Sequence, residues 1–516
     1  TAPCSDACPL SLCIEGYVKN IAAGNFEDAL KHVLAGTALP ETVCRVCHRP
    51  CEDVCVTRDT TGPIPINELK RFVVTWAAER EQKKEPKRES REARGGDQEP
   101  SAESAAPHVA VVGAGPSGLT AASELRARGY DVTLFDRAER PGGLLASVLP
   151  AYRLPTDAIE RDVARILSSG VVFRGGQTLG RDFTLGGLLA DDYEAVYLAI
   201  GAHRSRSLDL PPAKSARPPE LVAALPFLTS ARSEPRRALA GPVLVIGGGD
   251  AAIDSARTAL RLGADAVTIA CLESRAEMPA LPDQVALAEA EGISIVTEVA
   301  PLRLDDQAVA MKAVGGDSGD EVRIGAHLVI SAIGQVPELT CLADDEIALE
   351  KTADGLLAVD AETGQTSHPQ VFAGGDVVPG HRTVTEAMGS ARRAAWAIDR
   401  SVRGVDVANE RRPPPLPRRG EPNPAPRHSA PERRQVTEGR VFSDSDVALT
   451  EAEARAEAER CLACGLCGNC RACLDVFGCP ALQPGAERVH IDASMCNGCN
   501  VCADMCPNNA ISRNGP

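Results

Sequence analysis

The sequence predicts a multidomain α/β protein, and three observations carry this prediction. The chain has 516 residues, too many for one hydrophobic core, and this length suggests roughly three or four domains. An apolar strand, a glycine-rich turn, a helix and a second strand occur in that order twice, which is typical of parallel α/β units. Of the 19 cysteines, seven precede residue 56 and ten follow residue 460, so both ends carry a chemistry that the middle lacks.

Composition and charge exclude several classes of protein. The hydrophobic content of 44% is ordinary, and no run of about 18 apolar residues indicates a membrane span. The N-terminal residues lack the basic-then-apolar layout of a secretory signal, so we expect a cytoplasmic protein. A formal net charge of -16 argues against a surface that binds nucleic acid.

Residues 1–79 are expected to form a helical domain with metal sites, in which segments such as Ile14 to Ala35 have helical character. Closely spaced cysteines without an export signal indicate metal ligands rather than disulfides. Because a cubane iron-sulfur cluster needs four converging thiolates, we expect the cysteine groups to fold together around 4Fe-4S clusters, with zinc as the alternative. The candidate ligands here are Cys4, Cys8, Cys13, Cys44, Cys47, Cys51 and Cys55.

Two segments are predicted to be linkers. Residues 80–107 are rich in charged residues, glycine, serine and proline and show no apolar period, so they indicate a solvated tether. Residues 409–449 are rich in proline and arginine and indicate a stiff spacer, with a polyproline ligand as the alternative.

The first strand-turn-helix-strand unit runs from His108 to Asp136 and carries G-x-G-x-x-G, which predicts a dinucleotide clamp. Asp136 ends the second strand, where a carboxylate can hydrogen-bond an adenosine ribose. We assign residues 108–241 and 341–408 to an FAD-binding domain, because the second unit suits a nicotinamide dinucleotide better. The candidate FAD contacts are Gly113, Gly115, Pro116, Ser117, Gly118, Asp136, Gly143, Leu144, Arg153, Gly201, Gly375, Asp376 and Thr383.

The second unit begins at Pro242 with a G-x-G-x-x-A variant, and residues 242–340 are assigned to an NAD(H)-binding domain. Glu273 ends its second strand, where a carboxylate can bridge two ribose hydroxyls and would repel a 2'-phosphate, so we predict NADH over NADPH. The alternative is a surface glutamate whose charge the nearby Arg275 weakens. The candidate contacts are Gly247, Gly249, Asp250, Ala251, Glu273, Arg275 and Gly334.

Residues 450–516 are predicted to form a two-cluster domain of α+β class. A strong helix former, TEAEARAEAER, leads into CLACGLCGNCRACLDVFGCP, and the tail carries CNGCNVCADMCP. The tail matches the C-x2-C-x2-C-x3-C-P spacing of bacterial ferredoxins, in which the fourth cysteine ligates the other cluster. The predicted ligands are Cys467, Cys470, Cys473 and Cys506 for one 4Fe-4S cluster, and Cys496, Cys499, Cys502 and Cys479 for the other.

Residues 1 to about 405 resemble the iron-sulfur flavoprotein family of the glutamate synthase small subunit and the NAD(P)H-binding half of dihydropyrimidine dehydrogenase. This resemblance implies a fold similar to adrenodoxin reductase, with FAD in one Rossmann-like domain and nicotinamide in an inserted second one. The motifs that carry it are PCSDACP, VCHRPCEDVC, PIPINELKRF, GAGPSGL, PGGLL, AYRLP, GGGDAAIDSARTALRLGA, EMPA, AIGQVP and VFAGGD.

The resemblance assigns Cys4 and Cys55 to one N-terminal cluster, which then lacks two ligands. Relatives usually begin with an R-C-L-x-C segment that the N-terminal end of this sequence does not show, and the same wording reappears at Arg460 to Cys464. We hypothesise that Cys461 and Cys464 complete this cluster. The alternative is that the site is empty or that upstream residues were trimmed, so the N-terminal domain holds one or two clusters.

The second N-terminal cluster also departs from the family pattern. Lys70 stands where some relatives place a Gln or Glu ligand, and an ammonium cannot ligate iron. The fourth ligand is therefore expected to be Cys13 or Cys44. The remaining ligands that the resemblance implies are Cys8, Cys47 and Cys51.

The resemblance implies an NAD(P)H-dependent subunit that takes a hydride onto FAD and passes single electrons through 4Fe-4S clusters to a partner protein or catalytic subunit of a hetero-oligomer, and we predict NADH as its coenzyme. Relatives that use NADPH carry an arginine pair where this chain has Leu272 and Glu273, which favours NADH. No catalytic side chain is expected, because the chemistry is centred on the flavin. The alternatives are a free-standing ferredoxin:NAD(P) oxidoreductase that acts on a soluble ferredoxin, and a non-catalytic redox scaffold.

Overall fold

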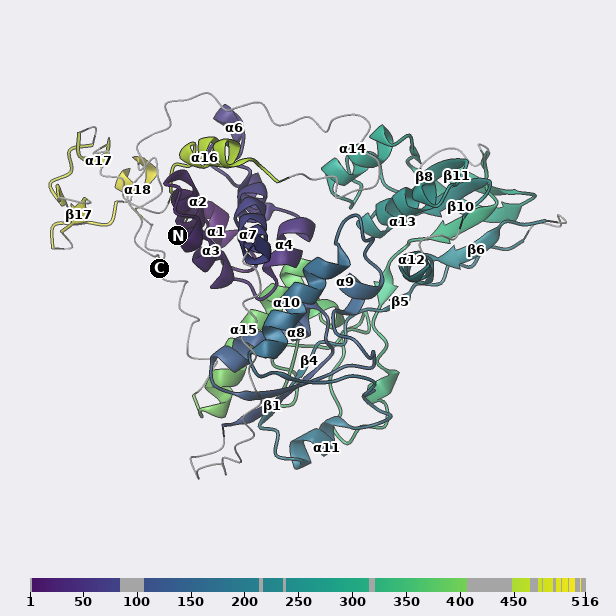
Figure 1. Cartoon of the computed structure of the whole chain (residues 1–516), viewed down its shortest axis with the longest axis horizontal. Coiled ribbons are helices and arrows are strands. Elements are labelled where there is room, and N and C mark those ends of the chain that lie inside the picture. The colour runs from purple at the N-terminus through teal and green to yellow at the C-terminus, as the bar shows by residue number, and fades with distance from the viewer. Residues whose placement is uncertain are drawn as a thin grey trace.

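A computed structural model of the chain shows the arrangement of its domains (Figure 1). None of the helices in the described ranges combines the length and the apolar character that a membrane crossing requires. Three of the predicted ferredoxin ligands, Cys467, Cys470 and Cys506, lie outside the described residues, as does most of both predicted linkers. The structure describes residues 2–83, 106–212, 217–234, 238–314, 321–405, 448–464, 472–475, 477–485, 489–492, 494–499, 501–505 and 511.

The N-terminal domain is helical, as predicted, and forms the purple part of Figure 1. The segment from Ile14 to Ala35 is two helices rather than one, because Gly24 adopts a left-handed conformation with φ of 78° between them. Phe26 and Phe72 meet edge to face, with ring centroids 5.1 Å apart, in the core of this domain. Its helices are α1 (Pro3–Asp6), α2 (Ile14–Ala22), α3 (Phe26–Leu34), α4 (Pro40–Val46), α5 (Pro50–Asp53), α6 (Arg58–Thr61) and α7 (Ile66–Lys83).

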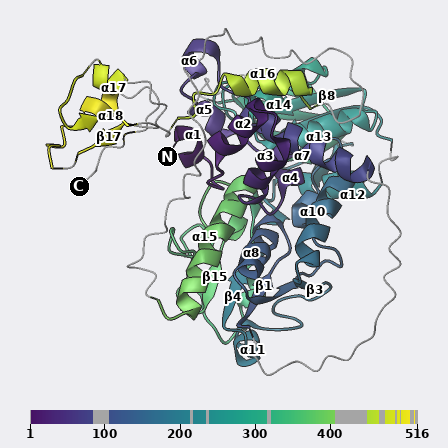
Figure 2. The ribbon, with the colours of Figure 1, turned by 60° about the vertical axis from the view of Figure 1, so that its left-hand side comes forward.

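The first dinucleotide unit forms a five-stranded parallel sheet in the order β15-β4-β1-β2-β3. Strand β1 is buried on both faces, because Val109 and Val111 contribute to one hydrophobic cluster and Ala110 and Val112 to another. Helices α8 and α15 pack against each other over one face (Figure 2). The elements are β1 (His108–Val112), α8 (Pro116–Ala127), β2 (Asp131–Phe135), α9 (Gly143–Ser147), α10 (Thr156–Ser168), β3 (Val172–Arg174), α11 (Leu185–Ala190), β4 (Ala195–Leu198), η1 (Thr340–Leu342), β15 (Val371–Ala373), η2 (Gly375–Val377) and α15 (Val384–Val402).

The second unit forms another five-stranded parallel sheet, in the order β6-β13-β7-β8-β9, beside an antiparallel sheet of β10, β11 and β12. The predicted boundary at residue 242 is wrong, because β6 (Glu220–Ala223) pairs with β13 of this sheet. Strand β5 (Arg204–Ser205) pairs with β14 (Gln335–Val336) where the chain enters and leaves the domain. The other elements are α12 (Ala224–Ser233), β7 (Pro242–Ile246), α13 (Asp250–Arg261), β8 (Ala266–Ala270), α14 (Pro282–Ala290), β9 (Ser294–Val296), β10 (Val299–Asp305), β11 (Ala308–Ala313), β12 (Glu321–Gly325) and β13 (Leu328–Ser331).

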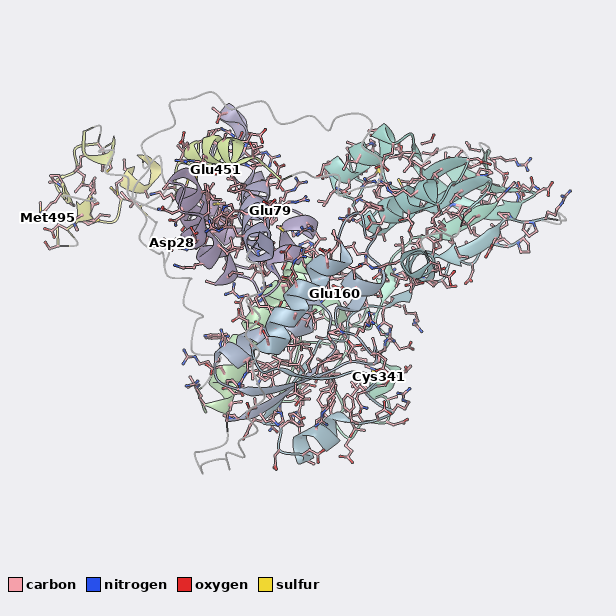
Figure 3. All side chains as sticks on the ribbon, viewed as in Figure 1. Asp28, Glu79, Glu160, Cys341, Glu451 and Met495 are labelled. Carbon is pink, nitrogen blue, oxygen red and sulfur yellow. The ribbon has the colours of Figure 1, made fainter. Side chains whose placement is uncertain are left out.

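Helix α16 (Glu451–Glu459) returns from the far side of the second linker to the N-terminal domain, where it contacts α2 and α7. Its small side chains Ala454 and Ala458 are buried in the same hydrophobic cluster as those helices. In Figure 3, Glu451 on this helix lies in the same helical group as Glu79 of α7. The first part of the predicted domain 450–516 therefore packs with the N-terminal domain, and we propose that the domain boundary falls after Cys464.

The C-terminal unit that follows is small and contains a two-stranded antiparallel sheet. The mixture of short helices and strands agrees with the predicted α+β class. Its elements among the described residues are α17 (Ala472–Asp475), β16 (Leu482–Gln483), β17 (His490–Ile491) and α18 (Val501–Met505).

Candidate cofactor and cluster sites

The first glycine-rich turn has the geometry that a dinucleotide pyrophosphate requires. Gly113 has φ of 106°, and a Cβ there would lie 2.3 Å from the carbonyl oxygen of Ala199. A Cβ on Gly118 would lie 1.7 Å from the carbonyl oxygen of Gly113, so both outer glycines are needed for backbone packing. Gly115 precedes α8, and nothing lies within 4 Å of where its Cβ would be. A phosphate can therefore approach the N-terminus of α8 at this open glycine.

The segment around Gly143 packs against this turn. A Cβ on Gly143, which has φ of 55°, would lie 2.8 Å from the Cα of Gly115. Leu144 follows on α9, and Gly201, at the end of β4, has φ of 66° with open space beyond its Cα. Gly115 and Gly143 thus lie against each other at the N-terminus of α8, and this place, called the FAD-domain opening below, fits a cofactor that approaches the backbone closely.

Asp136 already has two protein partners. One carboxylate oxygen accepts a hydrogen bond from the backbone N-H of Ala114 at 2.6 Å, and the other accepts from that of Ala138 at 2.7 Å. The carboxylate thereby ties the end of β2 to the glycine-rich turn. Each carboxylate oxygen has a second lone pair, so the predicted contact with a ribose stays a prediction.

Other predicted FAD residues hold the protein around this opening. Ser117, which follows Pro116 in the first turn of α8, has its hydroxyl 2.8 Å from that of Tyr197. Gly375 donates its backbone N-H to the hydroxyl of Ser390 at 2.9 Å. The Thr383 hydroxyl accepts from the backbone N-H of Glu386 at 3.2 Å and so caps α15.

Asp376 behaves differently from these residues. Burial raises the pKa of its half-buried carboxyl group, and Arg382 only partly opposes this rise. In the described part of the chain, no hydrogen-bond donor reaches this carboxylate. An acceptor in this position fits the predicted hydrogen bond from a ribityl hydroxyl of the cofactor.

Arg153 joins the two dinucleotide domains, and its predicted contact with FAD stays a prediction. Its guanidinium donates from Nη1 to both carboxylate oxygens of Asp254, at 2.8 and 2.7 Å, and the two side chains are only 11% and 6% exposed. The neighbouring Tyr152 ring lies under the guanidinium groups of Arg257 and Arg261, at 5.0 and 4.1 Å from its centroid. The sequence analysis missed Asp254, although a second aspartate four residues after Asp250 on one helix was a signal.

The second glycine-rich turn repeats the geometry of the first. A Cβ on Gly247, which has φ of 138°, would lie 2.5 Å from the carbonyl oxygen of Ala332. Nothing lies within 4 Å of the Cβ position of Gly249, at the N-terminus of α13. A Cβ on Gly248 would lie 2.7 Å from Oε2 of Glu273, so this carboxylate stands beside the turn where an adenosine ribose is expected.

The remaining predicted NAD residues surround this turn or have other partners. Asp250 and Ala251 begin α13, and the Asp250 carboxylate accepts from the backbone N-H of Leu281 at 3.2 Å. Arg275 forms an ion pair with Glu289 at 2.8 Å, and its predicted contact with the coenzyme stays a prediction. Gly334 has φ of 110° directly before β14.

At the N-terminal domain, four cysteines from three distant segments line one cavity, called the four-cysteine cavity below. Cys4 and Cys55 come from the N-terminal domain, and Cys461 and Cys464 come from the segment after α16. Burial, with smaller contributions from the negative charges of Cys464, Cys55 and Glu15, raises the pKa of the Cys461 thiol to about 12, and the backbone N-H of Ala463 partly opposes this rise. Side chains such as Ile14, Val18 and Ile64 form apolar walls.

A second set of cysteines, called the three-cysteine group, consists of Cys8, Cys47 and Cys51. Burial raises the pKa of Cys51, and the charges of Cys47 and Cys8 add to this rise while Lys70 opposes it. Lys70 is buried, and its charge also lowers the pKa of Cys8, although burial dominates there. The structure thus brings Lys70 to the three-cysteine group, at the place where a fourth ligand is expected.

Neither candidate for that fourth ligand is singled out by the structure. Burial raises the pKa of Cys44 to about 11, and its thiol donates to the carbonyl oxygen of Glu41 at 3.3 Å. The Cys13 thiol lies 3.9 Å from Oε1 of Glu15. The choice between Cys13 and Cys44 stays a prediction.

The three-cysteine group lies against the helix that begins at the FAD-domain opening. His48, next to Cys47, has Nδ1 3.0 Å from the hydroxyl of Thr385 in the first turn of α15. A Cβ on Gly389 of the same helix would lie 2.5 Å from the carbonyl oxygen of Pro9, next to Cys8. Sequence analysis missed this link, because nothing in the local pattern of α15 indicates what its small residues contact.

In the C-terminal unit, two predicted ligands flank the hairpin of β16 and β17. Leu482 pairs with Ile491, and the residues that flank the hairpin continue the pairing. Cys479 precedes β16, where its carbonyl oxygen accepts from the backbone N-H of Leu482, and Cys496 follows β17. Burial raises the pKa of Cys502, to which the charges of Cys496 and Cys499 contribute. Cys473, which lies on α17, is buried.

The donor chemistry of the four-cysteine cavity fits an iron-sulfur cluster. Thiolates are soft ligands, and a cubane holds four of them on separate iron corners. Four thiols between apolar walls therefore fit a 4Fe-4S cluster. Within the described ranges, no three histidine, cysteine or acidic side chains form a group that could hold a single metal ion.

Family models match three parts of this chain. Residues 107–393 match the pyridine nucleotide-disulphide oxidoreductases. Residues 1–82 match the model for dihydropyrimidine dehydrogenase domain II with its 4Fe-4S cluster. Residues 489–512 match the 4Fe-4S binding domain.

Individual relatives cover most of the chain. It is 36% identical to the NADP(+)-dependent formate dehydrogenase subunit beta of Moorella thermoacetica over 78% of its own length, and it spans 60% of that relative. It is 32% identical to the NAD-dependent dihydropyrimidine dehydrogenase subunit PreT of Escherichia coli O157:H7, over 78% of this chain and 92% of the relative. It is 33% identical to the glutamate synthase [NADPH] small chain of Azospirillum brasilense, over 77% and 85%.

Solved structures are similar to part of this chain. FprA from Mycobacterium tuberculosis, in complex with NADPH, is 16% identical with a TM-score of 0.48 over 58% of this chain and 85% of its own. Thioredoxin reductase of Lactococcus lactis is 22% identical with a TM-score of 0.45 over 58% of this chain and 100% of its own.

Proposed function

Because the chain belongs to the pyridine nucleotide-disulphide oxidoreductases, and to the iron-sulfur flavoproteins related to the glutamate synthase small chain, we propose that it is an NADH-dependent electron-input subunit of a larger redox enzyme. It oxidises NADH at the second dinucleotide domain and delivers electrons through its cysteine-rich ends to a partner protein. Bound FAD would supply the conversion of a hydride into single electrons.

The observation that carries this proposal is a series of cysteine sites that lie between helix α15 and the segment after helix α16. The three-cysteine group touches α15, which begins at the FAD-domain opening, through His48 and Pro9. Cys51 of that group also contributes to the raised pKa of Cys4, which lines the four-cysteine cavity; burial is the largest cause of that rise. The cavity in turn reaches the segment that leads into the predicted ferredoxin unit. Clusters held at these places would form a relay from the flavin towards the C-terminus.

The preference for NADH rests on residues of this chain, since the names of the relatives divide between NAD and NADP. Glu273 places its carboxylate beside the turn at Gly248, where it can accept hydrogen bonds from both ribose hydroxyls and would repel a 2'-phosphate. Arg275 is paired with Glu289 and does not offset that repulsion.

The role as a subunit is supported by two relatives, which are subunits of formate dehydrogenase and of dihydropyrimidine dehydrogenase. The substrate of the larger enzyme would then be converted on another chain. The FAD-domain opening, the second glycine-rich turn and the cluster sites require no side-chain nucleophile for this role. Anaerobic purification that yields a single chain with ferredoxin-reducing activity would favour the free-standing oxidoreductase instead.

The proposed function can be tested by mixing the anaerobic holoprotein with NADH and following the flavin absorbance. We expect prompt bleaching with NADH and slower bleaching with NADPH. Failure of both nucleotides to bleach the flavin would remove this proposal and leave the non-catalytic scaffold.

A matched pair of variants locates the reaction. Gly249→Val places a side chain into the open space at the second turn, so NADH should no longer bleach the flavin while dithionite still does. Gly115→Val does the same at the first turn and should lower the FAD content of the purified protein. If Gly249→Val left the rate of bleaching by NADH unchanged, nicotinamide would bind elsewhere.

A further inference from the structure

We propose that Cys4, Cys55, Cys461 and Cys464 ligate one 4Fe-4S cluster, which fastens the segment after the second linker to the N-terminal domain. The inference deepens the proposed function, because it rests on that function for the direction of electron flow. It assigns the complete ligand set of a cluster that has only two cysteines in the N-terminal domain.

The first argument is the composition of the four-cysteine cavity. Two of its cysteines lie more than 400 residues from the other two along the chain, yet all four line the same cavity. The other lining residues are mainly aliphatic, and Glu15, the acidic residue among them, has its Oε2 occupied by the hydroxyl of Ser5 at 2.9 Å. The cavity therefore offers thiols in an apolar shell, which is the chemistry that an iron-sulfur cluster needs.

The second argument is that the segment is held in place by contacts that do not involve metal. Arg460 is 5% exposed, and its Nη2 donates to the carbonyl oxygens of Thr61 and Gly62, at 2.6 and 2.8 Å. A capping box at Thr450 and Glu453 fixes the start of α16. The segment is thus anchored to the N-terminal domain by the packing of α16 on α2 and α7 and by Arg460, which directly precedes Cys461.

The third argument is a turn geometry that the two cysteine sets share. The backbone N-H of Ala463 points at the sulfur of Cys461 at 3.5 Å, and that of Arg49 points at the sulfur of Cys47 at 3.3 Å. Ala463 and Arg49 have φ of 49° and 60°, a left-handed conformation that is costly for residues other than glycine. N-H donors to the sulfurs are among the interactions that set the potential of an iron-sulfur cluster.

The consequence concerns the exit of electrons. Cys467, a predicted ferredoxin ligand outside the described residues, follows Cys464 by three residues, so their Cα atoms can be at most about 11 Å apart. A cluster in the four-cysteine cavity would therefore be tied by a short peptide to the first ferredoxin cluster. The R-C-L-x-C segment would connect the flavoprotein domains to the ferredoxin unit and would also ligate the cluster that passes electrons between them.

The test compares iron and acid-labile sulfide per FAD in anaerobically purified full-length variants. Cys461→Ser/Cys464→Ser should lose four iron atoms per FAD and one set of signals in the electron paramagnetic resonance spectrum of the reduced protein. Adding Cys4→Ser to this double variant should remove no further iron, because the same cluster is already gone. The control is Cys341→Ser, whose thiol donates to the carbonyl oxygen of Glu338 at 3.5 Å and lines no cysteine site. A double variant with wild-type iron content would overturn the inference.

A second measurement needs no variant and covers the case in which the double variant does not fold. Anomalous scattering at the iron edge from crystals of the unmodified protein should show a peak between the sulfurs of Cys4, Cys55, Cys461 and Cys464. A cavity without iron would overturn the inference. Neither measurement depends on NADH oxidation. If the double variant loses four iron atoms per FAD, but NADH does not bleach the flavin of the unmodified protein, the proposed function is refuted and this inference stands.

Discussion

The two dinucleotide domains begin with the same local structure and differ in the acid that ends their second strand. In both domains the first glycine, Gly113 or Gly247, leaves no room for a Cβ because a carbonyl oxygen lies close to it. The later glycine, Gly115 or Gly249, faces open space at a helix N-terminus. Asp136 uses both of its oxygens to accept backbone N-H groups of its own domain. Glu273, one methylene longer, reaches Gly248, and no backbone N-H in the described part of the chain binds its carboxylate.

This difference teaches that a glycine-rich turn defines a phosphate site but not the nucleotide. We propose that the nucleotide is selected by the hydrogen bonds that the acid can still accept. In the first domain the acid chiefly holds the turn together, and in the second it is available to a ligand. Substitutions at the two acids should therefore have different consequences, one in protein stability and cofactor retention and the other in coenzyme choice.

The largest effect is expected from Asp136→Ala. The substitution leaves the buried N-H of Ala114 without its acceptor, which costs about 1–3 kcal/mol, whereas the exposed N-H of Ala138 can bind water instead. We expect a lower unfolding temperature and less than stoichiometric FAD in the purified protein, measured by calorimetry and by flavin absorbance after denaturation. The control is Asp131→Asn at the exposed start of the same strand, which should change little. A variant with one FAD per chain and the wild-type unfolding temperature would show that Asp136 does not stabilise the turn.

The parts of the fold that sequence predicts are those in which local pattern and long-range pairing agree. The apolar run before Gly113 is buried on both faces, as a central parallel strand must be. Strand β6 was missed, because its four residues become a strand only by pairing with β13, more than 100 residues later. The same limit applies to Arg153, since its partner Asp254 lies 101 residues away and on another domain.

The candidate sites show the same division. Glycine and cysteine spacings indicated the turns and ligand sets directly, because their chemistry is encoded within a few residues. The contact of α15 with His48, and the return of α16 to the N-terminal domain, depend on which surfaces the rest of the fold leaves open. The alternation of alanine and glutamate in α16 indicates which face of the helix is buried, but it does not indicate which elements cover that face.

An intermediate effect is expected from Glu273→Gln, which tests the second acid. Losing a charge-assisted hydrogen bond to the ribose weakens NADH binding by about 1.5–3 kcal/mol, and removing the negative charge also favours the 2'-phosphate of NADPH. The ratio of kcat/KM for NADH to that for NADPH, measured by flavin bleaching or acceptor reduction, should fall by about tenfold or more. The matched control is Glu277→Gln, a neighbouring surface glutamate that accepts from Ser274. An unchanged ratio would mean that Glu273 only ends its strand.

The smallest effect is expected from Arg275→Ala, and this small effect is itself informative. Arg275 and Glu289 are 45% and 43% exposed, and an exposed ion pair contributes about 0.2–1 kcal/mol. If Arg275 is committed to Glu289, its removal should change kcat/KM for either coenzyme by less than about threefold, in the range of that small energy. Glu289→Gln provides the contrast, because it frees the guanidinium to attract a 2'-phosphate and should improve NADPH use slightly without affecting NADH. A large loss of NADPH use in Arg275→Ala would instead place this arginine at the ribose, and the distinction between the two acids would then depend on a pair of residues rather than on Glu273 alone.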